Sequence, residues 1–314
     1  MKREHTLQVV LGSVAIGGRS PVSIESMGRI NPVQVEKCLA EVNAAALAGS
    51  DCFRIAVHNE NALSGLIQVK RCSPIPIVAD IHFQPELAFK AVREGIGGVR
   101  VNPGTWKDRG KFEQLIDLLI NSSCVLRLGA NTGSLPLHHQ QKGRVEALFE
   151  SIAELLTIPQ KKGFQRIILS AKSTDIDETI EIYERLADQF IYPLHVGLTE
   201  AGEGLEGIIK STLALGIILK MGIGNNIRVS LTSTDPVLES QVAVQILQGI
   251  GLRTKGIEVI SCPTCARKKG DVVSLVQEIK KVVQAMKPLR ALKLAVMGCE
   301  VNGPGEAKDA DLGL

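Results

Sequence analysis

The stretch IPIVADIHFQPELAFKAVREGIGGVRVNPG, residues 75–104, shows the unit from which most of the chain is built. It reads as an apolar strand over 75–81, an amphipathic helix over 85–94 and a second strand over 98–101. Strands that alternate with helices form parallel sheets with right-handed crossovers. The stretch therefore predicts one turn of a parallel α/β fold.

The same unit recurs in both directions along the chain. Further strands are predicted over 21–26, 52–57, 125–128, 166–171, 192–196 and 227–231, which makes eight in all. Eight such units over about 250 residues are typical of a (β/α)8 barrel. An open doubly wound sheet is the alternative, but it favours a G-x-G-x-x-G motif after the first strand, and the sequence has none there. We predict an α/β protein with a TIM-like barrel over residues 1–252.

Composition limits the classes of partner. The 314 residues are 45% apolar and 22% charged, as in ordinary globular proteins, and the formal net charge is only +3. So small a charge, with 3% aromatic residues, gives no indication of a nucleic-acid or membrane partner. Seven cysteines in a chain of this length do not form a disulfide framework, and no signal core follows the charged N-terminus. We expect a cytoplasmic protein.

The pattern changes after residue 252. A strand over 256–260, a helix over 271–285 and a strand over 292–297 predict a small α+β domain spanning 256–314. Each of these strands runs into a loop of small residues, Gly and Pro that carries thiols, SCPTC at 261–265 and GCEVNGPGE at 298–306.

These thiols indicate a metal centre. The C-x-x-C pair Cys262 and Cys265 can reach one centre together, and Cys299 supplies a third sulfur. Three thiolates do not complete an all-cysteine zinc site, but they suit an iron–sulfur cluster. Glu306 is the nearest candidate for a fourth ligand, because the Gly-Pro-Gly turn can fold it back towards Cys299. The alternative is that these cysteines are buried and inert.

The strand ends of the predicted barrel carry an excess of positive charge. Active sites of such barrels lie at the carboxyl ends of the strands. Five cations come from five different strands: Arg54, Arg100, Arg127, Lys172 and Arg228. One carboxylate would need one Arg, so this number indicates a phosphate or diphosphate ligand. Each of these residues alone could instead belong to an ordinary surface or structural ion pair.

Polar residues accompany the cations in the same segments: Asp80, His82, Asn102, Asn131 and Ser230. Asp80 can also serve to fix one of the cations. His82 and His195 could each be either packing residues or catalytic residues. Glu200, at a strand end before a helix, is the best candidate for proton transfer.

Seven motifs, in order, resemble the 4-hydroxy-3-methylbut-2-enyl diphosphate synthases, the iron–sulfur enzymes of the non-mevalonate isoprenoid route. They are VADIHF (78–83), RVNPG (100–104), LGANTGSL (128–135), LTEAG (198–202), IRVSLT (227–232), SCPTCAR (261–267) and GCEVNGPGEAKDADLG (298–313). The resemblance runs from about Val9 to the last residue, and the last two motifs are the most specific.

The resemblance implies a two-electron reductive ring opening of 2-C-methyl-erythritol 2,4-cyclodiphosphate with loss of water. Ferredoxin or flavodoxin would supply electrons through a [4Fe-4S] cluster on Cys262, Cys265, Cys299 and Glu306. The substrate-binding residues would be the five cations with Asp80, His82, Asn102, Asn131 and Ser230, and Glu200 would be the acid. Family members are homodimers in which the cluster domain of one chain covers the barrel of the other.

Two departures from the family pattern stand out. Residues 26–31 read SMGRIN where a Thr/Asn-rich turn is usual, and the chain stops at Leu314 where the family continues. We therefore expect a shortened cluster domain. Two rival interpretations stay open: an aldolase-like phosphate-binding barrel with a structural zinc and a Schiff base at Lys172, and an inactive homologue.

Overall fold

The chain folds into two compact units. The computed structural model describes residues 1–136, 141–233, 235, 237–254, 256–286 and 291–314. One unit spans Met1–Leu252 and the other Arg253–Leu314. Among the described helices, none combines the length and apolar content that a membrane crossing requires.

The first unit is the predicted (β/α)8 barrel. Its parallel strands are β3 (Ser23–Met27), β4 (Cys52–Val57), β5 (Ile77–Ile81), β6 (Gly98–Val101), β7 (Val125–Asn131), β8 (Ile167–Lys172), β9 (His195–Val196) and β10 (Asn226–Ile227). They pair in the order β8-β7-β6-β5-β4-β3-β10-β9. A parallel bridge between Leu169 and Leu194 joins the two ends of this sheet, so the strands form a ring.

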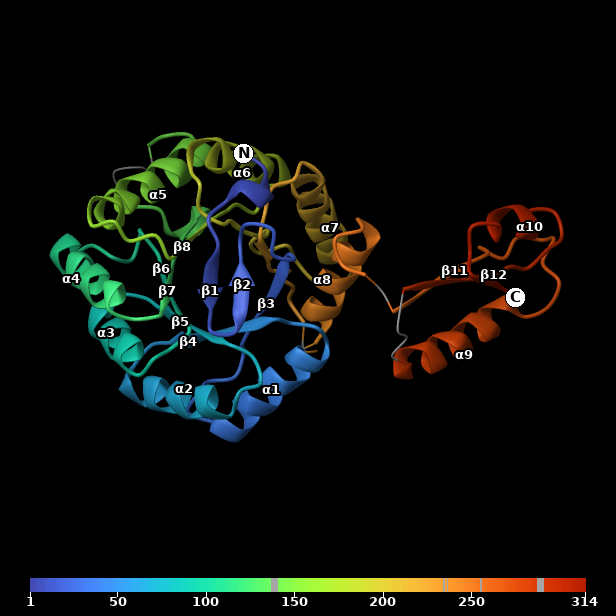
Figure 1. Ribbon diagram of the computed structural model, residues 1–314, viewed down its shortest axis with the longest axis horizontal. Helices are drawn as coiled ribbons and strands as arrows, with labels where there is room; N and C mark the ends of the chain where they lie inside the picture. Colours follow the sequence, from blue (N-terminus) through green and yellow to red (C-terminus); the bar gives the residue numbers. More distant parts are fainter. Residues whose placement is uncertain (137–140, 234, 236, 255, 287–290) are drawn as a thin grey trace. The chain divides into compact units, whose positions relative to one another are not determined.

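The helices lie around the outside of this ring (Figure 1). They are α1 (Val35–Leu47), α2 (Glu60–Cys72), α3 (Pro85–Arg93), α4 (Arg109–Ile120), α5 (Arg144–Lys161), α6 (Ile176–Gln189), α7 (Gly204–Lys220) and α8 (Leu238–Gly249). In α3, Pro85 occupies the first turn, where its missing N–H costs nothing, and Leu87, Ala91 and Val92 are buried. Burial of such apolar faces against the strands builds the main core.

A hairpin closes the amino end of the barrel. Strands β1 (Val9–Leu11) and β2 (Val14–Ile16) pair antiparallel around Gly12, whose φ of +59° suits glycine. Buried residues of the hairpin form one apolar cluster with residues at the starts of four barrel strands: Cys52, Val78, Val125 and Ile168. Ligands therefore reach the barrel interior from the carboxyl ends of the strands.

The second unit contains a small parallel sheet and two described helices. Its parallel sheet contains β11 (Ile257–Ser261), β12 (Leu292–Val296) and β13 (Leu312–Gly313), with α9 (Val272–Ala285) and the short α10 (Gly303–Glu306). Asp271 caps α9 by accepting the backbone N–H of Ser274 at 3.1 Å. The predicted strands and helix occur here within one residue of their expected bounds, whereas β13 was not predicted.

Candidate active site

A buried carboxylate, Asp80 on β5, gathers three of the predicted site residues. Its Oδ1 lies 3.1 Å from Arg100 Nη1 and 3.3 Å from His82 Nε2, and its Oδ2 lies 3.6 Å from Arg54 Nε. Arg100 also donates from Nη2 to the carbonyl of Gly129 at 2.8 Å. The geometry agrees with the expectation that Asp80 fixes a cation, since it holds two guanidinium groups.

A second buried carboxylate, Glu25 on β3, was missing from the sequence-based site. Its Oε2 lies 2.8 Å from Arg127 Nη1, and its Oε1 lies 3.9 Å from both Arg54 Nε and His195 Nε2. Strands β3 and β7 are four apart in an eight-stranded ring, so this ion pair reaches across the barrel. The available signal was a charged residue inside a short strand, which is costly without a partner.

These cations control the ionisation of both carboxylates. Burial on its own would raise the pKa of Glu25, but the charges of Arg127 and Arg54 outweigh it and lower the pKa. For Asp80, burial likewise opposes ionisation, and Arg54 and Arg100 hold the pKa well below its usual range. Both groups are therefore anionic, and the barrel interior is an alternating network of buried charges.

The remaining cations have hydrogen-bonding capacity to spare. Buried donors of this site without a hydrogen-bond partner among the described residues include Arg127 Nε and Nη2, Lys172 Nζ, Arg228 Nε and Ser230 Oγ. Burial and then the neighbouring charges of Arg228 and Arg54 hold the pKa of Lys172 well below its usual value. Unpaired buried donors are costly, so this cluster indicates a site for an anion that supplies the acceptors.

The segments around this cluster show one difference from the predicted strands and one close contact that makes room for Lys172. Arg228 and Ser230 were predicted within the eighth strand, but β10 ends at Ile227, so they lie in the segment after it. Gly197 makes room for the lysine: a Cβ there would lie 2.4 Å from the carbonyl oxygen of Arg228 and 2.8 Å from Lys172 Nζ.

A cavity of about 430 Å³ opens at the carboxyl ends of β7, β8 and β9. Asn131, Thr199 and Glu200 are among its lining residues. Asn102 donates to Ser134, another lining residue, at 2.7 Å. The exposed Glu200 has a φ of +53°, a strained backbone conformation of the kind that clusters at functional sites. Glu200 and Asn131 therefore line the same cavity.

His195 lies inside the barrel, and its Nε2 has no hydrogen-bond partner among the described residues. It is fully buried, its Nδ1 is within hydrogen-bonding distance of Asn226 Oδ1, and its backbone carbonyl accepts from Tyr183 Oη at 2.5 Å. Burial, with the nearby charges of Arg127 and Lys172, lowers its pKa well below the usual value. The imidazole is therefore neutral.

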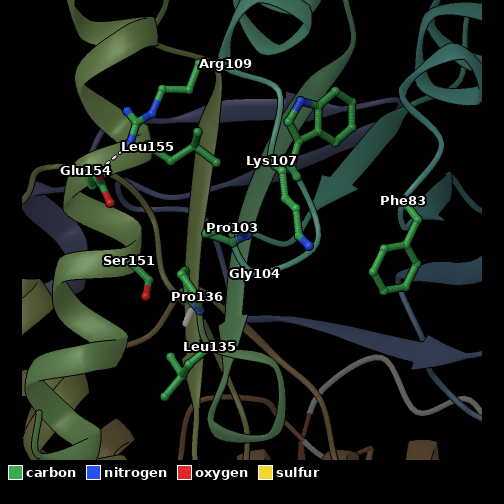
Figure 2. Close-up of a pocket in the computed structure, with 11 residues that line it drawn as sticks. Phe83, Pro103, Gly104, Lys107, Arg109, Leu135, Pro136, Ser151, Glu154 and Leu155 are labelled. Carbon is green, nitrogen blue, oxygen red and sulfur yellow. Dashed lines mark hydrogen bonds and ion pairs between the residues drawn. The ribbon is translucent and has the colours of Figure 1, made fainter. Parts of the chain in front are cut away.

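A larger cavity of about 580 Å³ begins beside the predicted residues, because Phe83 and Pro103, which follow His82 and Asn102 in the chain, line it. Figure 2 shows it between α5 and the segment after β6, with Lys107 and Leu155 on its walls and the Arg109–Glu154 ion pair at one end. None of the predicted site residues lines it. The size of this cavity alone would favour it as the binding site, but the unpaired cations favour the barrel interior.

The cysteine loops of the second unit lie side by side. A Cβ on Gly298 would lie only 3.4 Å from Cys262 Sγ, so the two loops approach closely at this glycine. Cys262 Sγ accepts the backbone N–H of Thr264 at 3.4 Å. Backbone N–H groups of Asn302 and Val301 lower the pKa of Cys299.

This donor chemistry fits a metal cluster, because thiolates are its ligands and N–H donors stabilise them. No three His, Cys, Asp or Glu side chains of the described residues form a group that could hold a metal ion. The four-ligand set of Cys262, Cys265, Cys299 and Glu306 therefore stays a prediction, with Glu306 exposed on α10.

A (β/α)8 barrel with unpaired cations inside it, together with a unit that carries paired thiol loops, defines a barrel enzyme for an anionic substrate. The chain belongs to the GcpE family. Residues 6–244 match the GcpE TIM-barrel domain, and residues 258–314 match the GcpE protein C-terminal domain.

Curated relatives are similar to this chain along almost its whole length. The 4-hydroxy-3-methylbut-2-en-1-yl diphosphate synthase (flavodoxin) of Malacoplasma penetrans is 41% identical over 99% of this chain and 86% of its own length. That of Desulfotalea psychrophila is 40% identical over all of this chain and 87% of its own length.

Solved structures agree on the fold. The dihydropteroate synthase of Xanthomonas albilineans has a TM-score of 0.55 at 14% identity, over 77% of this chain and 98% of its own. The N-acetylneuraminic acid synthetase of Leptospira borgpetersenii has a TM-score of 0.57 at 15% identity, over 88% and 96%.

Proposed function

We propose that the unpaired cations of the barrel bind the diphosphate of 2-C-methyl-erythritol 2,4-cyclodiphosphate, which the chain converts to 4-hydroxy-3-methylbut-2-enyl diphosphate. As a member of the GcpE family with curated synthase relatives, the chain is an iron–sulfur oxidoreductase of isoprenoid precursor synthesis. The family match sets aside the zinc-dependent lyase alternative.

One observation carries the site assignment: buried donors without partners on Arg127, Lys172, Arg228 and Ser230. They come from three parts of the ring: β7, the end of β8, and the segment after β10, which carries both Arg228 and Ser230. A diphosphate has enough oxygens to accept from all of them, and guanidinium groups suit its geometry. Each charge-assisted bond of this kind contributes about 1.5–3 kcal/mol.

The other predicted residues shape and serve this site. Asp80 fixes Arg54 and Arg100, so their guanidinium groups are held in place before the substrate arrives. The leaving hydroxyl must take up a proton to depart as water. We assign that proton to Glu200, which faces the 430 Å³ cavity at the strand ends together with Asn131.

We assign a [4Fe-4S] cluster to Cys262, Cys265, Cys299 and Glu306. When bound, such a cluster passes low-potential electrons one at a time into the substrate. The chain's own part is to supply ionised thiols, and the backbone N–H groups around Cys299 favour the thiolate.

The partners follow from the same assignment. The names of the relatives specify flavodoxin, so we propose flavodoxin as the electron donor, with ferredoxin as the alternative. We also propose a homodimer with a barrel domain over 1–252 for substrate binding and a cluster domain over 256–314. Since free thiolates require a reducing compartment, we place the protein in the cytoplasm.

The test is an anaerobic assay on protein reconstituted with iron and sulfide. With flavodoxin or a small chemical reductant, phosphorus NMR should show the cyclic diphosphate converting to the linear one. Metal analysis should give iron and sulfide in equal amounts. Zinc with no iron, or a substrate adduct trapped on Lys172 by borohydride, would contradict the proposal, and loaded protein without turnover would favour the inactive homologue.

A further inference from the structure

Glu25 occupies a position that the proposed function does not yet explain. It is 2% exposed, and its carboxylate reaches from β3 across the barrel to Arg127 on the facing wall at 2.8 Å. Its other oxygen, Oε1, has no hydrogen-bond partner among the described residues. A fixed negative charge therefore lies among cations that are to bind an anion.

The charges of the site can be counted. Five cations line the barrel, namely Arg54, Arg100, Arg127, Lys172 and Arg228. Asp80 contacts two of them, and Glu25 contacts Arg127 and lies near Arg54. Glu239, the next acidic group, also acts on Arg228, but it pairs with a sixth cation, Arg29, at 3.5 Å, so the two charges of that pair cancel in the count. With Lys172 protonated, the form that a bound anion favours, the excess of the site is three positive charges, and it would be four without Glu25.

The two ligands of the reaction differ in charge. Each phosphorus of the cyclic diphosphate carries one ionised oxygen, so the substrate is a dianion. Ring opening leaves a terminal phosphate with a further ionisable oxygen, whose pKa is about 6 by analogy with phosphate monoesters. At pH 8 the linear product is therefore a trianion, and every positive charge in the site attracts it more strongly than the substrate.

We propose that Glu25 is a specificity-determining residue, whose negative charge limits how tightly the barrel holds the trianionic product relative to the dianionic substrate. The inference rests on the function proposed above. Its consequence is product release: a site with four excess charges would retain the product, and release often limits turnover.

The test compares Glu25→Gln with the wild-type protein. Gln keeps an oxygen acceptor for Arg127 and removes only the charge. Calorimetry at pH 8 on cluster-loaded protein without reductant gives the Kd of the cyclic substrate and of the linear product. We expect the product Kd to fall by about threefold or more beyond any fall in the substrate Kd, with stronger product inhibition in turnover.

Glu41→Gln is the matched control. Glu41 on α1 is also buried, but its carboxylate accepts the backbone N–H groups of Arg29 and Ile30 outside the cation cluster. Its ratio of the two Kd values should equal that of the wild type. Should Glu25→Gln fail to fold, Glu25→Asp decides: it retains the charge, so a threefold change in its ratio would overturn the inference.

The outcomes separate the two proposals. An unchanged ratio in Glu25→Gln, with both ligands bound, would overturn the role of Glu25 and leave the reaction intact. A wild-type protein that binds neither diphosphate would overturn the proposed function and this inference together.

Discussion

Replacing Asp80 by Asn should destabilise the barrel strongly. The carboxylate lies 3.1 Å from Arg100 and 3.6 Å from Arg54, and at an effective dielectric constant of about 20 each contact corresponds to about 5 kcal/mol of attraction before desolvation. Desolvation offsets part of this, but removing one partner of a buried pair still costs about 3–5 kcal/mol, because the guanidinium groups stay buried without their counter-ion.

The measurement is urea unfolding followed by fluorescence. Trp106 is the sole tryptophan of the sequence and is buried in the first unit, so its emission reports on the barrel alone. Glu60→Gln is the control, because its ion pair with Lys90 is exposed and should change the free energy of unfolding by less than about 1 kcal/mol. A loss below about 1 kcal/mol in Asp80→Asn would refute the network argument.

The pH dependence provides a second check on the same variant. The folded-state pKa of Asp80 lies well below its usual value, so its contribution is complete above the unfolded-state pKa, about 3.9. The difference in stability between wild type and Asp80→Asn should be constant from about pH 5 to 8. It should shrink as the pH falls below about 4 and vanish once the folded-state carboxylate is protonated.

Three further variants test separate parts of the site. Gly197→Ala should weaken substrate binding by at least about tenfold in calorimetry, because its Cβ would displace Lys172 or the backbone at Arg228; an unchanged Kd would contradict this role. Cys299→Ser should lose bound iron and turnover together, and full iron content would remove it from the ligand set. Glu200→Gln should keep its iron but lower kcat by about a hundredfold, and normal turnover would exclude it as the acid.

The barrel was predictable because its signal is local. The alternation of apolar strands and amphipathic helices is written into segments such as 75–104, and charged residues at strand ends mark the mouth. Asp80 could be singled out because it follows an apolar run directly. The same pattern could not reveal which side chains meet across the ring.

Glu25 shows where sequence reasoning stopped. Its partner Arg127 lies on the opposite wall, and their contact depends on the closure and tilt of all eight strands rather than on any local motif. The positive φ of Glu200 also has no signal in the local sequence. The cysteine spacing was readable, but the positions of Cys265 and Glu306 depend on loops that no periodicity specifies.

The hairpin across the amino end has a consequence for traffic through the enzyme. Because Val9, Leu11 and Ile16 pack against the starts of the strands, the barrel interior is closed at its amino end. Product must leave by the same opening, at the carboxyl ends of the strands, through which substrate enters. Substrate cannot enter until product has left, so a group that covers this opening would control binding and release together.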